Sequence, residues 1–128
     1  MQILINPGAE LSIYRQIMRQ IVEAIASARL APGEKLPSHR DLSEQLVVAP
    51  LTVKKAYDEL EALGYIETQR GRGTFVSEKR PRIDKTDHLD KIEEAARHLL
   101  SLANLGGFHL SDITKILKDV DREMKEKV

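Results

Sequence analysis

The chain has no cysteine and no tryptophan, and aromatic residues make up only 4% of its 128 residues. Without cysteine it forms no disulfide, holds no metal through thiolates and uses no cysteine nucleophile. With so few aromatic side chains, we expect a core of aliphatic residues between packed helices. No run of about 18 apolar residues exists for a membrane-spanning helix, and the N-terminus has no basic leader, so the sequence predicts a cytoplasmic protein.

The chain also lacks any excess of charge, because 20 basic residues balance 20 acidic ones. The charges are nevertheless unevenly distributed. Residues 69–85 hold six basic and two acidic residues, a net charge of +4, whereas residues 86–128 hold seven basic and nine acidic residues, a net charge of −2. A positive stretch therefore precedes a mildly acidic tail, and a polyanionic partner becomes plausible for the middle of the chain.

Apolar residues at helical spacing predict three helices in the first half of the chain. The first covers residues 12–30 and is expected to end at Pro32, because proline cannot continue the hydrogen-bond ladder. Ser38 is expected to cap a second helix of about two turns. The third helix is expected over residues 50–63, with proline in its first turn and Gly64 after its end.

Two β-prone runs follow, residues 65–69 and 74–76, and Arg70-Gly71-Arg72-Gly73 joins them. This pattern predicts a hairpin with a glycine-rich tip. Together with the three helices, the hairpin predicts a winged helix-turn-helix, in which the third helix enters the major groove and the second crosses the phosphate backbone.

The remaining residues predict a linker and a helical tail. The fold class we expect is mainly α with a small β-hairpin, in which a DNA-binding domain over residues 1–78 and a linker over residues 79–86 precede a two-helix dimerisation hairpin over residues 87–128. Gly106 and Gly107 mark the turn between the two tail helices.

The candidate DNA contacts lie at three places along the chain. Hydrogen-bonding and cationic side chains near the start of the third helix are suited to base edges, and the arginines of the glycine-rich tip are suited to phosphates and a narrow minor groove. A phosphate contact is also expected at the start of the second helix. The residues concerned are Ser38, His39, Thr52, Lys54, Lys55, Arg70, Gly71, Arg72 and Gly73.

Three segments resemble the GntR superfamily of bacterial regulators, namely residues 33–46, with its Leu-Pro-Ser-His-Arg sequence, residues 51–66 and residues 70–76. The likeness covers roughly the first 76 residues. The short tail is similar to that of the YtrA-like branch, whose tails dimerise. The resemblance implies that Arg40 grips phosphate or base, and that DNA contacts come from Thr52, Lys54, Arg70 and Gly71.

The chain departs from that family at one place. The family usually has serine or asparagine and then arginine before the Thr-Val pair, whereas this chain has Ala49 and Pro50. Proline has no amide to donate and alanine cannot cap a helix through its side chain. We therefore expect base reading to shift to Leu51, which can touch a thymine methyl group, and to the polar residues after it.

Apolar residues recur at helical spacing through the tail. Two helices this short cannot enclose a stable core alone, so the tail of a second copy is expected to cover them and form a homodimer. A two-fold dimer sets the recognition helices about 34–36 Å apart and favours a palindromic operator. The residues expected at the dimer interface are Leu89, Ile92, Ala96, Leu99, Leu100, Ile113, Ile116, Leu117 and Val120.

The sequence thus predicts a DNA-binding repressor, with a small-molecule effector of unknown identity binding at the tail interface or between tail and head. The competing hypothesis is a winged-helix module that binds protein, whose groove-facing helix would carry apolar anchors and little positive charge. Tyr57 fits either the core or a DNA contact. We expect no metal or cofactor, because the four histidines lack close ligand spacing, and no enzymatic activity, because no nucleophile-base pair or cofactor loop occurs.

Overall fold

The computed structural model describes residues 2–79, 81 and 84–126. Arg80 and Arg82, which belong to the positive stretch of the sequence, lie outside these described residues. The chain divides into two compact units, one that extends to Pro81 and one that contains the helical tail.

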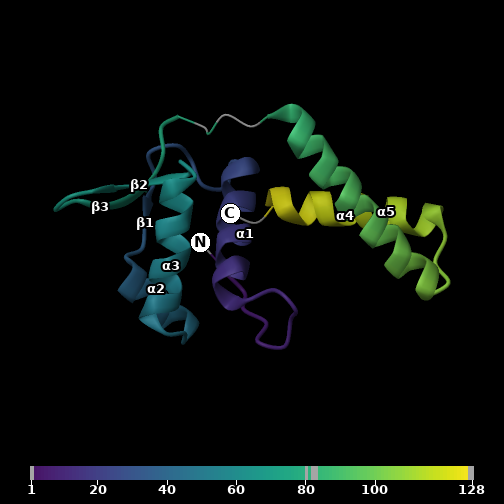
Figure 1. Ribbon diagram of the computed structural model, residues 1–128, viewed down its shortest axis with the longest axis horizontal. Helices are drawn as coiled ribbons and strands as arrows, with labels where there is room; N and C mark the ends of the chain where they lie inside the picture. The colour runs from purple at the N-terminus through teal and green to yellow at the C-terminus, as the bar shows by residue number, and fades with distance from the viewer. Residues whose placement is uncertain (1, 80, 82–83, 127–128) are drawn as a thin grey trace. The chain divides into compact units, whose positions relative to one another are not determined.

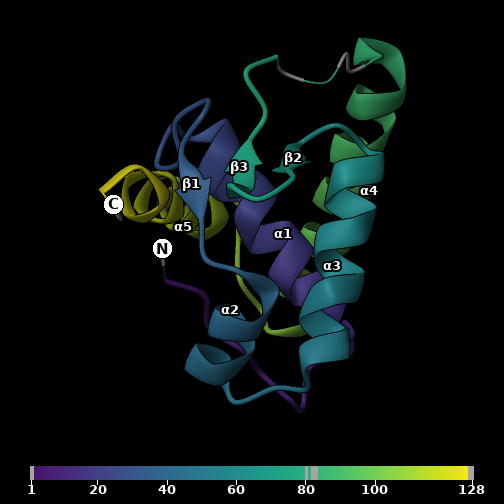
Figure 2. The same cartoon turned by 90° about the vertical axis from the view of Figure 1, so that its left-hand side faces the viewer.

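Three helices build the first unit: α1 (Ile13–Ala26), α2 (His39–Leu46) and α3 (Pro50–Ala62). Figure 2 shows α1 beside α3, with α2 at the lower left on the same side of α3, and α3 packs against both. Their apolar faces meet in one aliphatic core, as the composition predicts. Its most deeply buried large side chains are Ile17, Ile21, Leu42, Val53, Leu60, Ile66 and Val76.

The first helix ends four residues earlier than predicted, at Ala26 rather than at residue 30. Ala28 has a positive φ of 60°, and the amides of Arg29 and Leu30 both donate to the carbonyl oxygen of Ala24, at 2.9 and 3.0 Å. These bonds satisfy one of the last carbonyl groups of the helix before the proline is reached. The prediction was wrong because it assigned the end of the helix to the nearest proline.

The helix-turn-helix has the caps that the sequence predicts. The hydroxyl of Ser38 accepts a hydrogen bond from the amide of Asp41 at 3.1 Å. Ala49 is extended (φ −60°, ψ 136°) and makes no side-chain cap, and Pro50 is the first residue of α3. Between the helices, Val47 adopts the left-handed conformation, with φ 55° and ψ 49°.

The hairpin is part of a three-stranded antiparallel sheet of β1 (Lys35–Leu36), β2 (Ile66–Gln69) and β3 (Gly73–Val76), in the order β1-β3-β2. Lys35 pairs with Phe75, and Leu36 pairs with Thr74. The sequence predicted only the hairpin, because a strand of two residues is too short to show a period. This extra strand attaches the middle of β3 to the segment that leads into α2.

Two glutamines of α1 hold the segment that precedes the helix. Gln20 accepts from the amide of Leu4 at 2.9 Å and donates to its carbonyl oxygen at 2.7 Å. Gln16, which is buried, accepts from the amide of Asn6 at 2.8 Å and donates to its carbonyl oxygen at 2.9 Å. Each side-chain amide thus pairs with the backbone as a neighbouring strand would, and Ile3 joins the core.

The second unit consists of α4 (Lys85–Leu105) and α5 (Leu110–Glu126), and α5 runs back across α4 after the turn (Figure 1). The helix α4 begins inside the predicted linker of residues 79–86, because the carboxylate of Asp84 caps it by accepting from the amide of Thr86 at 2.9 Å. Among the described residues, no helix combines the length and the apolarity needed to cross a membrane.

Candidate nucleic-acid interface

The exposed side of the helix-turn-helix carries Arg40 on α2 and Leu51 and Lys54 on α3, while Thr52 is half-buried. Lys54 Nζ lies 2.7 Å from Oδ2 of Asp58, one turn further along α3, and both side chains are at least half open to water. Such an exposed pair contributes at most about 1 kcal/mol. The ammonium group therefore remains available to a stronger anionic partner.

Lys55 lies differently from Lys54, although the two are adjacent in the sequence. Its Nζ is 4.1 Å from the centroid of the Tyr14 ring on α1, a cation–π contact. At an exposed site this contact is worth about 0.5–1 kcal/mol. Lys55 therefore lies along the edge between α1 and α3, and the structure does not group it with Arg40 and Lys54.

Tyr57 is a core residue. It is 6% exposed, and its hydroxyl donates to the carbonyl oxygen of Pro37 at 2.7 Å. Burial raises the pKa of its phenol, because the charged form would lose its hydration. Of the two interpretations that the sequence allowed, core packing is confirmed, and the hydroxyl connects α3 to the entry of α2.

The tip of the hairpin is exposed at Arg70, Gly71 and Arg72. The amide of Arg72 donates to the carbonyl oxygen of Gln69 at 2.9 Å and closes a four-residue turn, in which Gly71 has a φ of 76°. A turn with positive φ at its third residue favours glycine. A Cβ atom on Gly71 would meet nothing within 4 Å, so the backbone there can approach another surface closely. Arg70 and Arg72 flank it, and both are exposed.

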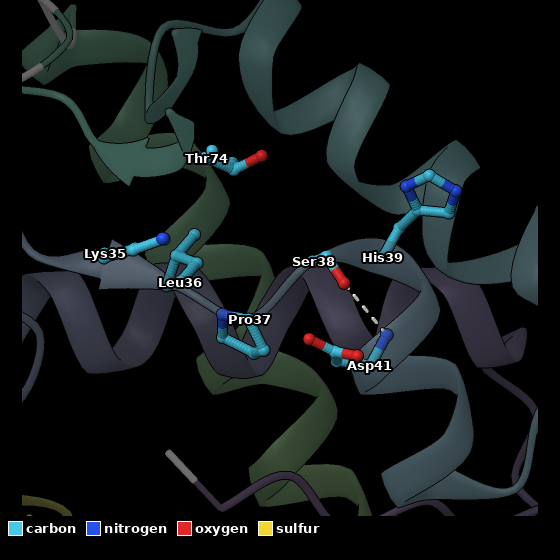
Figure 3. Close-up of a pocket in the computed structure, with 8 residues that line it drawn as sticks. Lys35, Leu36, Pro37, Ser38, His39, Asp41 and Thr74 are labelled. Atoms are coloured by element: carbon cyan, nitrogen blue, oxygen red, sulfur yellow. Dashed lines mark hydrogen bonds between the residues drawn. The ribbon is translucent and has the colours of Figure 1, made fainter. Parts of the chain in front are cut away.

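A hollow of about 430 Å³ lies where β1, the start of α2 and the first residues of β3 meet (Figure 3). Lys35 crosses it, since its Cε lies 2.9 Å from the place a Cβ on Gly73 would occupy. Lys35 is a candidate contact that sequence reasoning missed, because only its pairing with β3 brings it to the hairpin. The lining residues are Lys35, Leu36, Pro37, Ser38, His39, Asp41, Gly73 and Thr74.

Apart from Lys54, which pairs with Asp58, the cations described above have no acidic partner among the described residues. Within the part of the chain that the structure describes, no acidic group lies at ion-pair distance from Lys35, Arg40, Arg70 or Arg72. Asp41, in the hollow, is the nearest carboxylate in the sequence to Arg40 and contributes its amide to the cap of α2. The same described residues contain no group of three or more side chains that could hold a metal ion. The arrangement is suited to binding phosphate groups through exposed cations.

Comparison with known proteins identifies the family. The model of the bacterial regulatory proteins of the gntR family matches residues 13–76, half of the chain, which spans α1 to β3. The chain belongs to the GntR family. This GntR-family protein is also 37% identical, over 123 residues, to the HTH-type transcriptional repressor YtrA of Bacillus subtilis, a match that covers 96% of this chain and 95% of that protein.

Solved structures agree with this assignment. A transcriptional antiterminator from Listeria monocytogenes EGD-e has a TM-score of 0.80 at 28% identity, with 99% of this chain and 95% of that chain covered. The DNA-binding domain of AraR in complex with operator ORX1 has a TM-score of 0.52 at 30% identity, with 58% and 92% covered. The predicted winged-helix fold, mainly α with a small β-hairpin, is confirmed, and the protein is a sequence-specific DNA-binding transcriptional regulator, not an enzyme.

The tail presents a second surface of interest. Ala103 and Ile113, on either side of the turn, are buried in the single chain, so the 5% exposed Ile113 is not open to a second copy as the sequence predicted. Most of the other apolar residues predicted at a dimer interface are at least 40% exposed. These are Leu89, Ile92, Leu100, Ile116, Leu117 and Val120. Sequence reasoning missed a group around the turn whose side chains are all more than half exposed: Leu102, Leu105, Phe108 and Leu110.

Proposed function

We propose that this regulator is a repressor that binds a palindromic operator as a homodimer in the cytoplasm. The observation that carries the proposal is that three elements of the first unit each carry exposed cations, with Arg40 on α2, Lys54 on α3 and Arg70 and Arg72 at the hairpin tip. Its similarity to YtrA, which is a repressor by name, supports the direction of regulation.

The contacts divide into two kinds. Arg40, Arg70, Arg72 and Lys35 bind phosphates, because long cationic side chains with no acidic partner fit the backbone of the duplex. The N-terminal turn of α3 enters the major groove and reads base edges, with Lys54 able to exchange Asp58 for a base acceptor. Gly71 and Gly73 let the hairpin backbone approach the sugar-phosphate edge. Ser38 and His39, at the start of α2, line the same hollow as Gly73.

The tail holds two copies together. Its buried apolar side chains are Ala103 and Ile113, while long apolar stripes on both helices remain exposed, and monomeric proteins rarely leave large contiguous apolar patches in water. In a two-fold dimer, the same apolar stripes of both copies pack against each other and are removed from water. Leu105 and Phe108, at the turn, extend the surface beyond the residues that the sequence indicated. The small-molecule effector stays a prediction.

The test begins with selection of bound fragments from random duplex DNA. We expect an inverted repeat, and fluorescence anisotropy should then show affinity that falls steeply with salt. Arg70→Ala combined with Arg72→Ala should weaken binding to all duplexes alike, whereas Arg19→Ala, which removes an exposed cation from α1, should not. Sedimentation should give a dimer. Retention of no DNA even in dilute buffer would contradict the proposal.

A further inference from the structure

The start of the recognition helix is apolar and exposed. Ala49, Pro50 and Leu51 all lie open to water, and the Leu51 side chain is 78% exposed. Ala49 makes no side-chain cap, and Pro50 has no amide hydrogen to donate. The first polar side chain of α3 is that of Thr52, which is half-buried.

Leu51 does not belong to the core. The side of α3 that packs against α1 and α2 is made by Val53, Ala56, Tyr57 and Leu60, all of them buried. Leu51 is three residues before Lys54, so the two side chains are neighbours on the outer side of the helix. The aliphatic side chain of Leu51 is thus exposed to water next to the cation of Lys54.

We propose that Ala49, Pro50 and Leu51 read thymine methyl groups in the major groove, so that the operator has thymine where this turn meets the bases. The inference rests on the proposed function. Guanine and adenine are read by bidentate side chains such as arginine, asparagine or glutamine, and none of these three residues can form such bonds. The thymine C5-methyl group is the apolar feature that the major groove offers.

The charge around the apolar turn indicates DNA as its occupant. Lys54 lies one turn further along α3, Arg40 is exposed on α2, and Arg70 and Arg72 are exposed on the hairpin that follows. A surface that inserts apolar side chains between exposed cations complements a groove lined by phosphates. A protein partner for the same turn would have to be acidic around an apolar pocket.

The experiment replaces single thymines of the selected operator with uracil, which deletes one methyl group and keeps the base pair. The wild-type regulator should lose about three- to fivefold in affinity at each contacted thymine, the value of one buried methyl group. In Leu51→Ala this loss should shrink or vanish. Leu63→Ala is the matched control, because Leu63 is equally aliphatic, 56% exposed and at the opposite end of α3.

The outcomes separate the two proposals. Binding of the operator with no loss at any uracil position overturns the inference and leaves the proposed function standing. Uracil sensitivity that persists unchanged in Leu51→Ala overturns it as well. Titrations of Leu51→Ala are run at low salt, where phosphate contacts keep the complex measurable, and Leu51→Met should retain most of the methyl preference. Failure to bind any duplex defeats the proposed function itself.

Discussion

We expect the substitution Val47→Gly, in the turn between α2 and α3, to stabilise the folded protein. Its backbone is left-handed (φ 55°, ψ 49°) and its side chain is 89% exposed. That conformation costs an L-residue about 1–2 kcal/mol, and a β-branched residue there is an outlier. Glycine removes the strain but gives the unfolded chain extra freedom worth about 0.5–1 kcal/mol. We expect Val47→Gly to raise the free energy of unfolding by about 0.5–1 kcal/mol.

Urea unfolding followed by circular dichroism measures this change as a higher midpoint with an unchanged slope. For a unit of this size the Tm should rise by about 2–8 °C. Val47→Asn, which tolerates the left-handed region without the freedom of glycine, should gain at least as much. A lower midpoint for both variants would refute the reasoning, since it would mean that the contacts of the valine side chain outweigh its strain.

A second pair of substitutions controls for the general effect of glycine. Ala28 has a positive φ of 60°, whereas Ala26, two residues earlier, is the last residue of α1, and both side chains are exposed. Ala26→Gly should destabilise the protein by about 0.5 kcal/mol, whereas Ala28→Gly should be neutral or stabilising. If both glycine substitutions lowered the free energy of unfolding equally, the backbone angle would not determine whether glycine stabilises or destabilises the protein.

The remaining predictions concern the DNA surface, the core and the tail. Lys35→Ala should reduce the slope of log affinity against log salt by about 1 without altering sequence preference, as anisotropy titrations can measure. Burial raises the pKa of Tyr57 above the value of about 10 in the unfolded chain. The free energy of unfolding should therefore fall as the pH rises above about 10, because the unfolded chain then loses this proton more readily than the folded one. Tyr57→Phe should flatten this alkaline loss and cost about 1 kcal/mol at neutral pH through the missing bond to Pro37. Leu117→Ser should weaken the dimer in sedimentation experiments, whereas Lys115→Ser should not.

The parts of the fold that follow from local chemistry could be predicted from the sequence. Ser38 capping α2, Pro50 opening α3 and the hairpin around Gly71 each depend on residues within one turn of each other. Local backbone preferences and hydrogen bonds decide such features, so the sequence contains the information in adjacent positions. The candidate contacts at these places could be named for the same reason.

Features that depend on distant pairing could not be predicted. β1 exists only because Lys35 meets Phe75, forty residues away, and two residues carry no period. Gln16 has the usual look of a polar helix residue, yet it is buried and binds the backbone of Asn6. Similarly, the sequence predicts the same role for Lys54 and Lys55. They differ because Lys55 contacts the ring of Tyr14 on another helix, which the sequence does not reveal.

The two-residue strand β1 has a mechanical consequence for recognition. Leu36 is bonded in register with Thr74 of the hairpin, and the cap of α2 at Ser38 follows two residues later. The distance between the hairpin tip, with Arg70 and Arg72, and the helices α2 and α3 is therefore set by a few hydrogen-bonded peptide groups instead of by a flexible loop. We therefore expect the regulator to distinguish duplexes by the width of their grooves as well as by their base edges.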